Sequence, residues 1–120
     1  MTIKEKSVAF LTLASAGKVD EAFQSFIHPQ FIHHNPYFSG DQQSFRQAMA
    51  DHARQFPDKS YDVLRALEDG ALTTVHGKVV FGDSIYSVIH IFRFQDGLIA
   101  EAWEASQELV KESPNQHGLF

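Results

Sequence analysis

The stretch that decides the fold is Ser84–Gln107, which reads SIYSVIHIFRFQDGLIAEAWEASQ. Two runs rich in β-branched and aromatic residues flank the pair Asp96-Gly97, and this pattern is typical of two strands joined by a tight hairpin turn. The same pattern occurs further upstream, so we predict four strands in an antiparallel meander. The predicted strands and turns are residues 61–68, Asp69-Gly70, 71–81, Gly82-Asp83, 84–94, Asp96-Gly97 and 98–107.

The first half of the chain predicts helices instead. Apolar side chains recur at helical spacing up to Gly17, between Val19 and Pro29, and between Asp41 and Phe56. Glycine and proline at the ends of these segments are typical helix terminators. Three helices followed by a meander predict an α+β fold, in which N-terminal helices pack on a curved antiparallel sheet and enclose a small-molecule pocket.

Length and composition favour one globular domain, residues 1–120. The formal net charge is -5 and there is no basic run, which argues against a nucleic-acid partner. The absence of cysteine excludes disulfides, thiolate zinc sites and a cysteine nucleophile. The charged N-terminus contains no long apolar run. We therefore expect no signal peptide, no membrane partner and a cytoplasmic location.

The turn at Asp96-Gly97 determines which residues of the last two strands share a face. A strict two-residue turn pairs His90 with Trp103, which would then line the pocket beside it. A type I turn with a bulge at the glycine instead places His90 opposite Ala102 and on the same face as Glu104. We favour the bulged form, and its apolar outer face predicts a homodimer. Its inner face carries Val88, His90, Phe92, Ala102 and Glu104, and its outer face carries Ile89, Ile91 and Trp103.

His90 interrupts an otherwise apolar strand, and Glu104 is the carboxylate predicted on the same face. A buried imidazole needs a hydrogen-bond partner, and a neighbouring carboxylate also raises the pKa of a histidine. Such a pair can transfer protons near neutral pH. The same pair also occurs in proteins as a purely structural contact, so both interpretations stay open.

Two further histidines are candidates for the pocket wall. His76 precedes Gly77, and a bulge at that glycine would turn His76 inward. His34 belongs to the segment His33-His34-Asn35-Pro36, whose Asn-Pro pair is typical of a turn. Adjacent histidines can bind zinc together with a distant one, so His33 and His34 are a possible metal half-site, and a metal-dependent enzyme would use His34, His76 and His90. Adjacent residues of an extended chain point to opposite sides, however, so the two adjacent histidines do not easily share one metal, and we expect none.

Several motifs occur along nearly the whole chain in a recognisable order. They are Phe31-Ile32-His33-His34-Asn35-Pro36, Gly40, His76-Gly77, His90-Ile91-Phe92-Arg93, Asp96-Gly97 and Glu101-Ala102-Trp103-Glu104-Ala105-Ser106-Gln107. In this order they resemble the SnoaL-like proteins of the nuclear transport factor two-like superfamily. The resemblance implies a cone-shaped α+β barrel, commonly dimeric, with a pocket between helices and sheet. Polyketide cyclases, ketosteroid isomerases, dehydratases and epoxide hydrolases are members or relatives.

Three positions depart from the pattern of this family. His90 stands where the family usually has Asp, Ala102 replaces His, and Glu104 replaces Asp. The resemblance therefore implies a pocket that keeps a carboxylate, one methylene longer, and gains an imidazole. Acid–base chemistry is still expected, with changed partners.

The predicted function is cofactor-independent acid–base catalysis, of isomerase, lyase or cyclase type, on a small apolar carbonyl compound. Glu104 or His90 would remove a proton next to the carbonyl group. His34, His76 or Asn35 would then donate a hydrogen bond to the enolate oxygen. The alternatives are a non-catalytic module that binds a hydrophobic ligand or mediates dimerisation, and a metal-dependent enzyme. The candidate substrate contacts are Asn35, Val88, Phe92 and Trp103.

Overall fold

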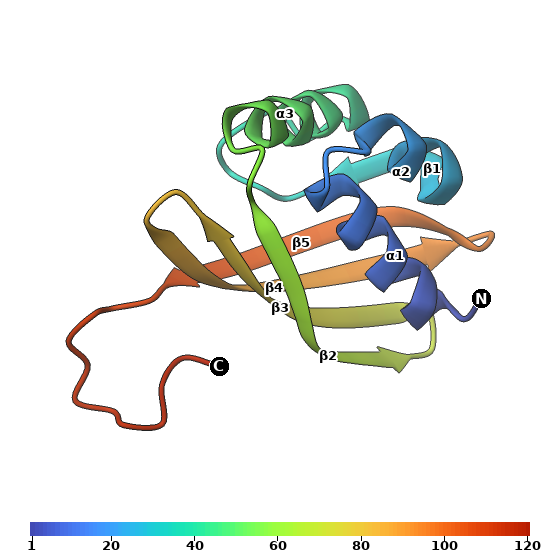
Figure 1. Cartoon of the computed structure of the whole chain (residues 1–120). Helices are drawn as coiled ribbons and strands as arrows, with labels where there is room; N and C mark the ends of the chain where they lie inside the picture. The colour runs from blue at the N-terminus through green and yellow to red at the C-terminus, as the bar shows by residue number, and fades with distance from the viewer.

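A computed structural model describes residues 1–120 as three helices and five strands. The helices cover one face of a curved sheet, and the residues after the last strand loop out and turn back toward the sheet (Figure 1). The arrangement confirms the predicted α+β fold. No helix is long and apolar enough to cross a membrane. The elements are α1 (Ile3–Ser15), α2 (Val19–Phe26), β1 (Ile27–His33), α3 (Gln42–Gln55), β2 (Ser60–Asp69), β3 (Leu72–Phe81), β4 (Ser84–Gln95) and β5 (Leu98–Glu108).

The helix ends follow from local chemistry. Thr2 and Glu5 form a capping box at the start of α1, in which each side chain accepts a hydrogen bond from the other residue's backbone N–H. Gly17 has φ 88°, and it stops α1 because glycine adopts this left-handed conformation without a steric penalty. Asp41 caps α3 by accepting a hydrogen bond of 2.9 Å from the Ser44 N–H. These signals are readable in the sequence.

The sheet has one strand more than predicted. Its order is β1-β5-β4-β3-β2, and β1 pairs in parallel with β5, with His33 opposite Ala102. The expectation of a purely antiparallel sheet is therefore wrong at this edge. The end of α2 at Phe26 agrees with the prediction that this helix ends before Pro29. An edge strand pairs on one side only, so β1 tolerates Pro29, which has no N–H to donate.

The other four strands form the predicted meander, but the bulge lies elsewhere than predicted. Asp96 and Gly97 have φ values of 54° and 77°, which is the conformation of a strict two-residue type I′ turn. The register shifts instead between Arg93 and Phe94, where Ala100 of β5 is the extra residue. The expected bulge at the glycine is therefore wrong.

The observed register of β4 and β5 pairs His90 directly with Glu104, whereas the predicted register paired it with Ala102. A bulge at Gly97 and one at Ala100 shift the pairing in opposite directions, so the two registers differ by two residues. Two residues is the repeat of a strand, and every side chain therefore keeps its face. The predicted inner face, including Val88, is confirmed although the predicted bulge is not.

The core lies where α1 and α2 meet the middle strands. Phe10, Phe23 and Phe92 are at most 2% exposed. The ring of Phe10 meets the other two edge to face, with centroids 5.5 Å from Phe23 and 5.8 Å from Phe92. Because α1 covers Phe92, this residue belongs to the core and does not line the cavity described below. This corrects the expectation that Phe92 contacts a substrate.

Candidate functional site

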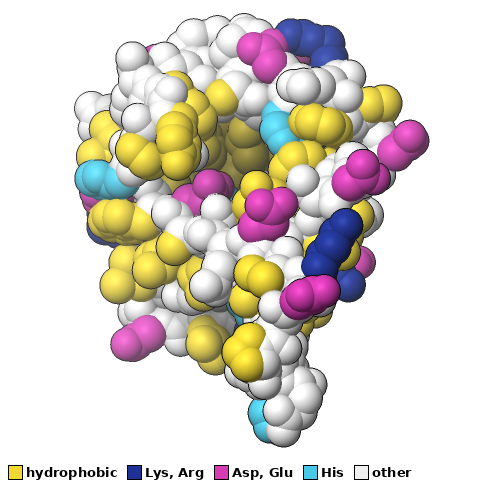
Figure 2. Space-filling model, turned by 90° about the vertical axis from the view of Figure 1, so that its left-hand side faces the viewer, with side chains coloured by type: hydrophobic (Ala, Val, Ile, Leu, Met, Phe, Trp, Pro, Cys, Tyr) yellow, Lys and Arg dark blue, Asp and Glu magenta, His cyan; other side chains and the backbone are white.

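A cavity of about 280 Å³ lies between α3, the loop after β1 and the inner face of the sheet. Figure 2 shows a hollow lined mainly by hydrophobic side chains, with acidic and histidine side chains beside it. Eleven of its eighteen lining residues are hydrophobic. Its size is near the lower end of the range of roughly 300–1,000 Å³ that is usual for small-molecule sites. The side chains that bring polar atoms to it include Asn35, His52, Lys59, Tyr61, His90 and Glu104.

His90 and Glu104 form a close hydrogen-bonded pair at this cavity. Nε2 of His90 lies 2.8 Å from Oε1 of Glu104, and the two side chains are 8% and 33% exposed. Burial raises the pKa of the Glu104 carboxyl, but the hydrogen bond from His90 and the charges of His90, His33 and His52 outweigh burial, so the pKa is lowered from its usual 4.5. Glu104 is therefore ionised at neutral pH and accepts the hydrogen carried by Nε2 of His90.

Two buried polar atoms at the cavity have no hydrogen-bond partner, namely the hydroxyl of Tyr61 and Nδ1 of His90. Buried polar atoms are almost always paired, so such exceptions need a reason. Burial, and then the charge of Glu104, raise the pKa of Tyr61, and the phenol keeps its proton. The cavity therefore contains one unused donor. When His90 is neutral with its hydrogen on Nε2, it also contains one unused acceptor.

Gly77 makes room for Tyr61. A Cβ at position 77 would lie 2.6, 2.7 and 2.8 Å from three atoms of the Tyr61 side chain, so any larger residue there would force the Tyr61 ring to move. Gly77 pairs regularly with Val88, and the register shift lies across from it in β2, after Val63. The bulge expected at Gly77 is therefore wrong. Sequence reasoning missed Tyr61, and the only signal for it was this glycine in the middle of a strand.

His76 lies on the outer face of the sheet, because regular pairing places it opposite Ile89. Its Nε2 lies 2.7 Å from Oγ of Ser87, and its Nδ1 contacts Arg65. The ring of Phe120, in the C-terminal tail, stacks on it with centroids 6.5 Å apart. Burial and the charge of Arg65 lower the pKa of His76. The prediction that His76 lies at the cavity wall is wrong.

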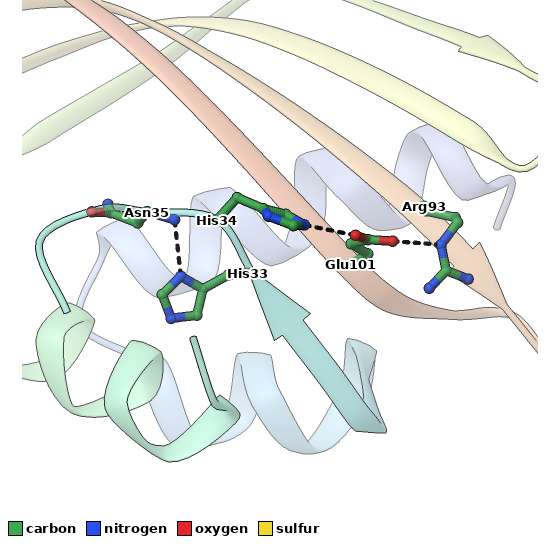
Figure 3. Close-up of polar contacts among 5 residues, drawn as sticks. All are labelled: His33, His34, Asn35, Arg93 and Glu101. Carbon is green, nitrogen blue, oxygen red and sulfur yellow. Dashed lines mark hydrogen bonds and ion pairs between the residues drawn. The ribbon is translucent and has the colours of Figure 1, made fainter. Parts of the chain in front are cut away.

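His34 also lies outside the cavity. Figure 3 shows its ring pointing toward Glu101 of β5, which also meets Arg93 of β4. Nε2 of His34 lies 2.7 Å from Oε2 of Glu101, and Arg93 donates to Oε1 over 2.9 Å. These hydrogen bonds lower the pKa of Glu101. The placement contradicts the prediction that His34 lies at the cavity wall.

Trp103 belongs to the same outer cluster. Its ring stacks on His34, with centroids 5.1 Å apart and planes within 5° of parallel. The bulged turn predicts this outer position, and Trp103 would have lined the cavity only with the strict turn pairing of His90 and Trp103. The prediction that Trp103 contacts a substrate is therefore wrong. His34 and Trp103 thus join the end of β1 to β5 rather than line the cavity.

His33 points to the opposite side of β1 and is 6% exposed. Its Nδ1 accepts a hydrogen bond of 3.1 Å from the backbone N–H of Asn35, as Figure 3 shows. Its Nε2 lies 2.6 Å from the carbonyl oxygen of Ser39 and donates to it. These bonds fold the loop between β1 and α3 over the cavity, where Asn35 and Phe38 line it. Asn35, which was predicted to contact a substrate, is thus a residue of the cavity wall.

His52 and Lys59 line the cavity where α3 ends and β2 begins, and neither was among the predicted site residues. Nζ of Lys59 donates to Nδ1 of His52 over 2.9 Å. Burial lowers the pKa of Lys59. Burial and the charge of Lys59 lower the pKa of His52, although the charge of Glu104 opposes them. His52 is therefore a neutral imidazole that presents Nδ1 as an acceptor.

The histidines do not come together as a metal site. His34 and His76 lie on the outer face of the sheet and His90 lies on the inner face. No group of three or more His, Cys, Asp or Glu side chains is arranged to hold a metal ion. The alternative of a metal-dependent enzyme built on these three histidines is therefore wrong.

Known proteins share this fold. A family model described as "SnoaL-like domain" matches residues 8–102. Among curated proteins, no sequence matches the chain. A solved structure of an NTF2-like protein of unknown function from Burkholderia xenovorans has a TM-score of 0.76 at 16% identity, and the match covers 93% of this chain and 88% of that one.

Two similar structures come from Streptomyces. "IdmH, a putative polyketide cyclase" from Streptomyces antibioticus has a TM-score of 0.73 at 17% identity, and the match covers 89% of this chain and 93% of that one. "AclR a putative hydroxylase" from Streptomyces galilaeus has a TM-score of 0.70 at 15% identity, with 88% and 91% covered. At such identities the likeness shows a shared fold, and a fold alone does not determine an activity.

Proposed function

Because the chain belongs to the SnoaL-like domain family and encloses a pocket of small-molecule size, we propose that it is an acid–base enzyme of isomerase, lyase or cyclase type. The proposed substrate is a small, mostly apolar carbonyl compound, and all the proton-transfer groups come from the chain itself. The observation that carries the proposal is the ionised Glu104 at an apolar cavity, held by His90 through one oxygen only. Its second oxygen makes no hydrogen bond within the chain and is free to accept a proton.

In the proposed reaction, the carboxylate of Glu104 takes a proton from the carbon next to the carbonyl group. The C–H electron pair moves into the new C=C bond, and the carbonyl oxygen becomes an enolate. Positioned proton transfer of this kind contributes about 10²–10⁴-fold in rate. His90 orients the carboxylate through its Nε2–H, and the retained proton on Glu104 is then returned to another carbon or to a leaving group.

The enolate oxygen needs a hydrogen-bond donor, and Tyr61 is the group that fits this role. Its hydroxyl is buried, lies at the cavity, is protonated and has no partner in the chain. A donor fixed in place before the reaction stabilises the developing charge without reorganisation, and removal of one such donor typically costs about 10²–10³-fold in rate. The role of hydrogen-bond donor to the enolate oxygen, which was predicted for His34, His76 or Asn35, is therefore assigned to Tyr61. His34 and His76 lie outside the cavity, and Asn35 is a second candidate for this role.

Exchange of α-protons tests the proposal without knowledge of the natural substrate. Cyclohexanone, acetophenone and phenylacetone would be incubated with the protein in deuterium oxide, and loss of their α-proton signals would be followed by NMR. We expect exchange faster than in buffer for at least one ketone. Binding of these ketones with no exchange would favour the alternative, a non-catalytic pocket for hydrophobic ligands, which the apolar lining also fits.

The Tyr61→Phe variant separates function from stability. It removes the hydroxyl that has no partner, so we expect exchange about 10²–10³-fold slower than in the wild type. Stability should not fall, because an unpaired buried polar group costs about 1–3 kcal/mol in the wild type. Urea denaturation and the NMR assay measure the two effects. A variant that loses stability and keeps its exchange rate would show that the hydroxyl is structural.

We further propose that the chain is a homodimer whose subunits meet through the outer face of the sheet. This face leaves large hydrophobic side chains exposed, with Leu67 at 66%, Leu72 at 45%, Ile89 at 40% and Ile91 at 37%. Exposed apolar surface of this kind is typical of an interface.

Light scattering at micromolar concentration tests the dimer. We expect twice the chain mass of 13.5 kDa. The Ile89→Lys variant should be a monomer, because a charge at the centre of an apolar interface would lose its water without gaining a partner. The Lys111→Glu variant, which changes a charge in the tail after β5, is the control and should leave the mass unchanged. A monomeric wild type would overturn this proposal.

A further inference from the structure

The cavity is flanked by two charged side chains of opposite sign from distant parts of the sheet. Glu104 lies on β5 and Lys59 directly precedes β2, and β4 and β3 separate these two strands in the sheet. Glu104 has His90 as its partner at 2.8 Å. Lys59 makes no salt bridge, and its only side-chain contact of hydrogen-bond length is Nδ1 of His52. The lysine is therefore a partly buried cation without an anion.

The surroundings of Lys59 are apolar and well ordered by packing. The ring of His52 packs against Phe56 and Phe81, with centroids 4.9 and 4.7 Å away, and Phe81 stacks on Tyr86 at 5.5 Å. A buried charge is costly unless it is paired, and apolar walls strengthen any ion pair that forms between them. An ammonium has three donors, and its bond to the neutral imidazole uses one of them.

We propose that Lys59, oriented by His52, is the subsite for a carboxylate group of the ligand. The class of ligand is then a small carbonyl compound with an apolar body and one carboxylate. Its body would lie against the hydrophobic lining, its carboxylate would accept hydrogen bonds from Nζ of Lys59, and its reactive end would lie toward Glu104. This deepens the proposed function, since it names the substrate class of the same cavity.

A matched pair of probes tests the subsite directly. Hydrocinnamate and its amide have nearly the same shape and differ in charge, so their dissociation constants, measured by calorimetry at neutral pH, isolate the contribution of the carboxylate. Hydrogen bonds to charged groups correspond to a preference of about 10–100-fold. We expect the wild type to prefer hydrocinnamate by that factor and Lys59→Gln to bind both probes equally. Lys59→Arg should keep part of the preference.

Lys78→Gln is the matched control, because it removes the same charge from the outer face, where Lys78 lies over the ring of Phe120. It should keep the full preference for hydrocinnamate. An equal affinity of the wild type for both probes, or a preference that survives in Lys59→Gln, would overturn the carboxylate subsite.

The two proposals fail in different ways. The ketones carry no carboxylate, so their α-proton exchange in the wild type tests the proposed catalysis alone, and the preference for hydrocinnamate tests the subsite alone. Exchange in the wild type, together with a preference that is lost in Lys59→Gln and kept in Lys78→Gln, supports both proposals. If neither probe binds at millimolar concentration, the carboxylate subsite is overturned, and the ketone exchange assay then decides separately whether the cavity is catalytic.

Discussion

The Glu104→Gln variant is expected to exchange the α-protons of ketones about 10²–10⁴-fold more slowly than the wild type while it keeps the fold. Gln has nearly the shape of Glu, and its amide oxygen can still accept the hydrogen bond that His90 donates over 2.8 Å. The amide cannot take up a proton at neutral pH, however. The variant therefore removes the proposed base and little else, and circular dichroism would verify that the structure is retained.

Glu101→Gln is the matched control for this experiment. Glu101 is likewise a carboxylate of β5 bound to a histidine, but its partners are His34 and Arg93 on the outer face. We expect Glu101→Gln to leave exchange unchanged. If Glu104→Gln keeps its exchange rate and His90→Gln loses it, the base is Nδ1 of His90, and the assignment of Glu104 is wrong.

The pH dependence of exchange has a defined sign. The pKa of Glu104 in the folded protein is lowered from 4.5, so the carboxylate is ionised above that pH and is protonated only as the pH falls through the lowered value. The acid limb of the rate should therefore lie below pH 4.5 and should be absent in Glu104→Gln. The raised pKa of Tyr61 keeps this donor protonated at neutral and moderately alkaline pH, so it contributes no alkaline limb there.

The Phe92→Ala variant is expected to lose about 3–5 kcal/mol of unfolding free energy, which is the usual cost of truncating a fully buried Phe. Phe92 is 0% exposed and its ring packs on Phe10, so the deletion leaves a cavity that α1 cannot fill without moving. A domain of this size has only about 5–15 kcal/mol to lose, so the variant should be close to unfolding. Urea denaturation measures the loss.

Two variants make this measurement interpretable. Phe92→Leu removes less volume and should lose less stability, which matters if Phe92→Ala does not fold. Phe120→Ala removes the same ring from the tail, where the residue is 38% exposed, and should change stability little. If Phe92→Ala lost less than about 1 kcal/mol of unfolding free energy and bound ligands more weakly, Phe92 would line the cavity and not belong to the core.

The turns and strands of the second half were predictable because their signals are local. The turn pairs that end in glycine need a left-handed conformation, and Gly70 and Gly97 adopt it with φ values of 59° and 77°. The faces of β4 and β5 were predictable as well, because side chains alternate with a repeat of two whichever bulge is present. His90 and Glu104 were therefore recognised as one pair, and the hydrogen bond of 2.8 Å between them agrees with that prediction.

The position of the bulge and the extra strand were not predictable, because both depend on distant residues. Nothing near Ala100 marks it as the bulged residue, and the pairing of β4 with β5 decides it. β1 forms because β5 offers a free edge beside it. Its sequence did not indicate a strand, because Pro29 lies within it. His76 was misplaced for the same reason, since the register shift lies across from it in β2.

The sequence by itself determined the α+β fold, the family and the pair of His90 and Glu104, because each depends on spacing along one strand or one hairpin. Only the tertiary structure decided which other groups share the cavity with them. Tyr61 and Lys59 come from β2 and the residue before it, and His52 comes from α3. Their meeting with His90 and Glu104 depends on how α3 and β2 fold over the sheet, and no local pattern encodes contacts between residues 52–61 and the last two strands.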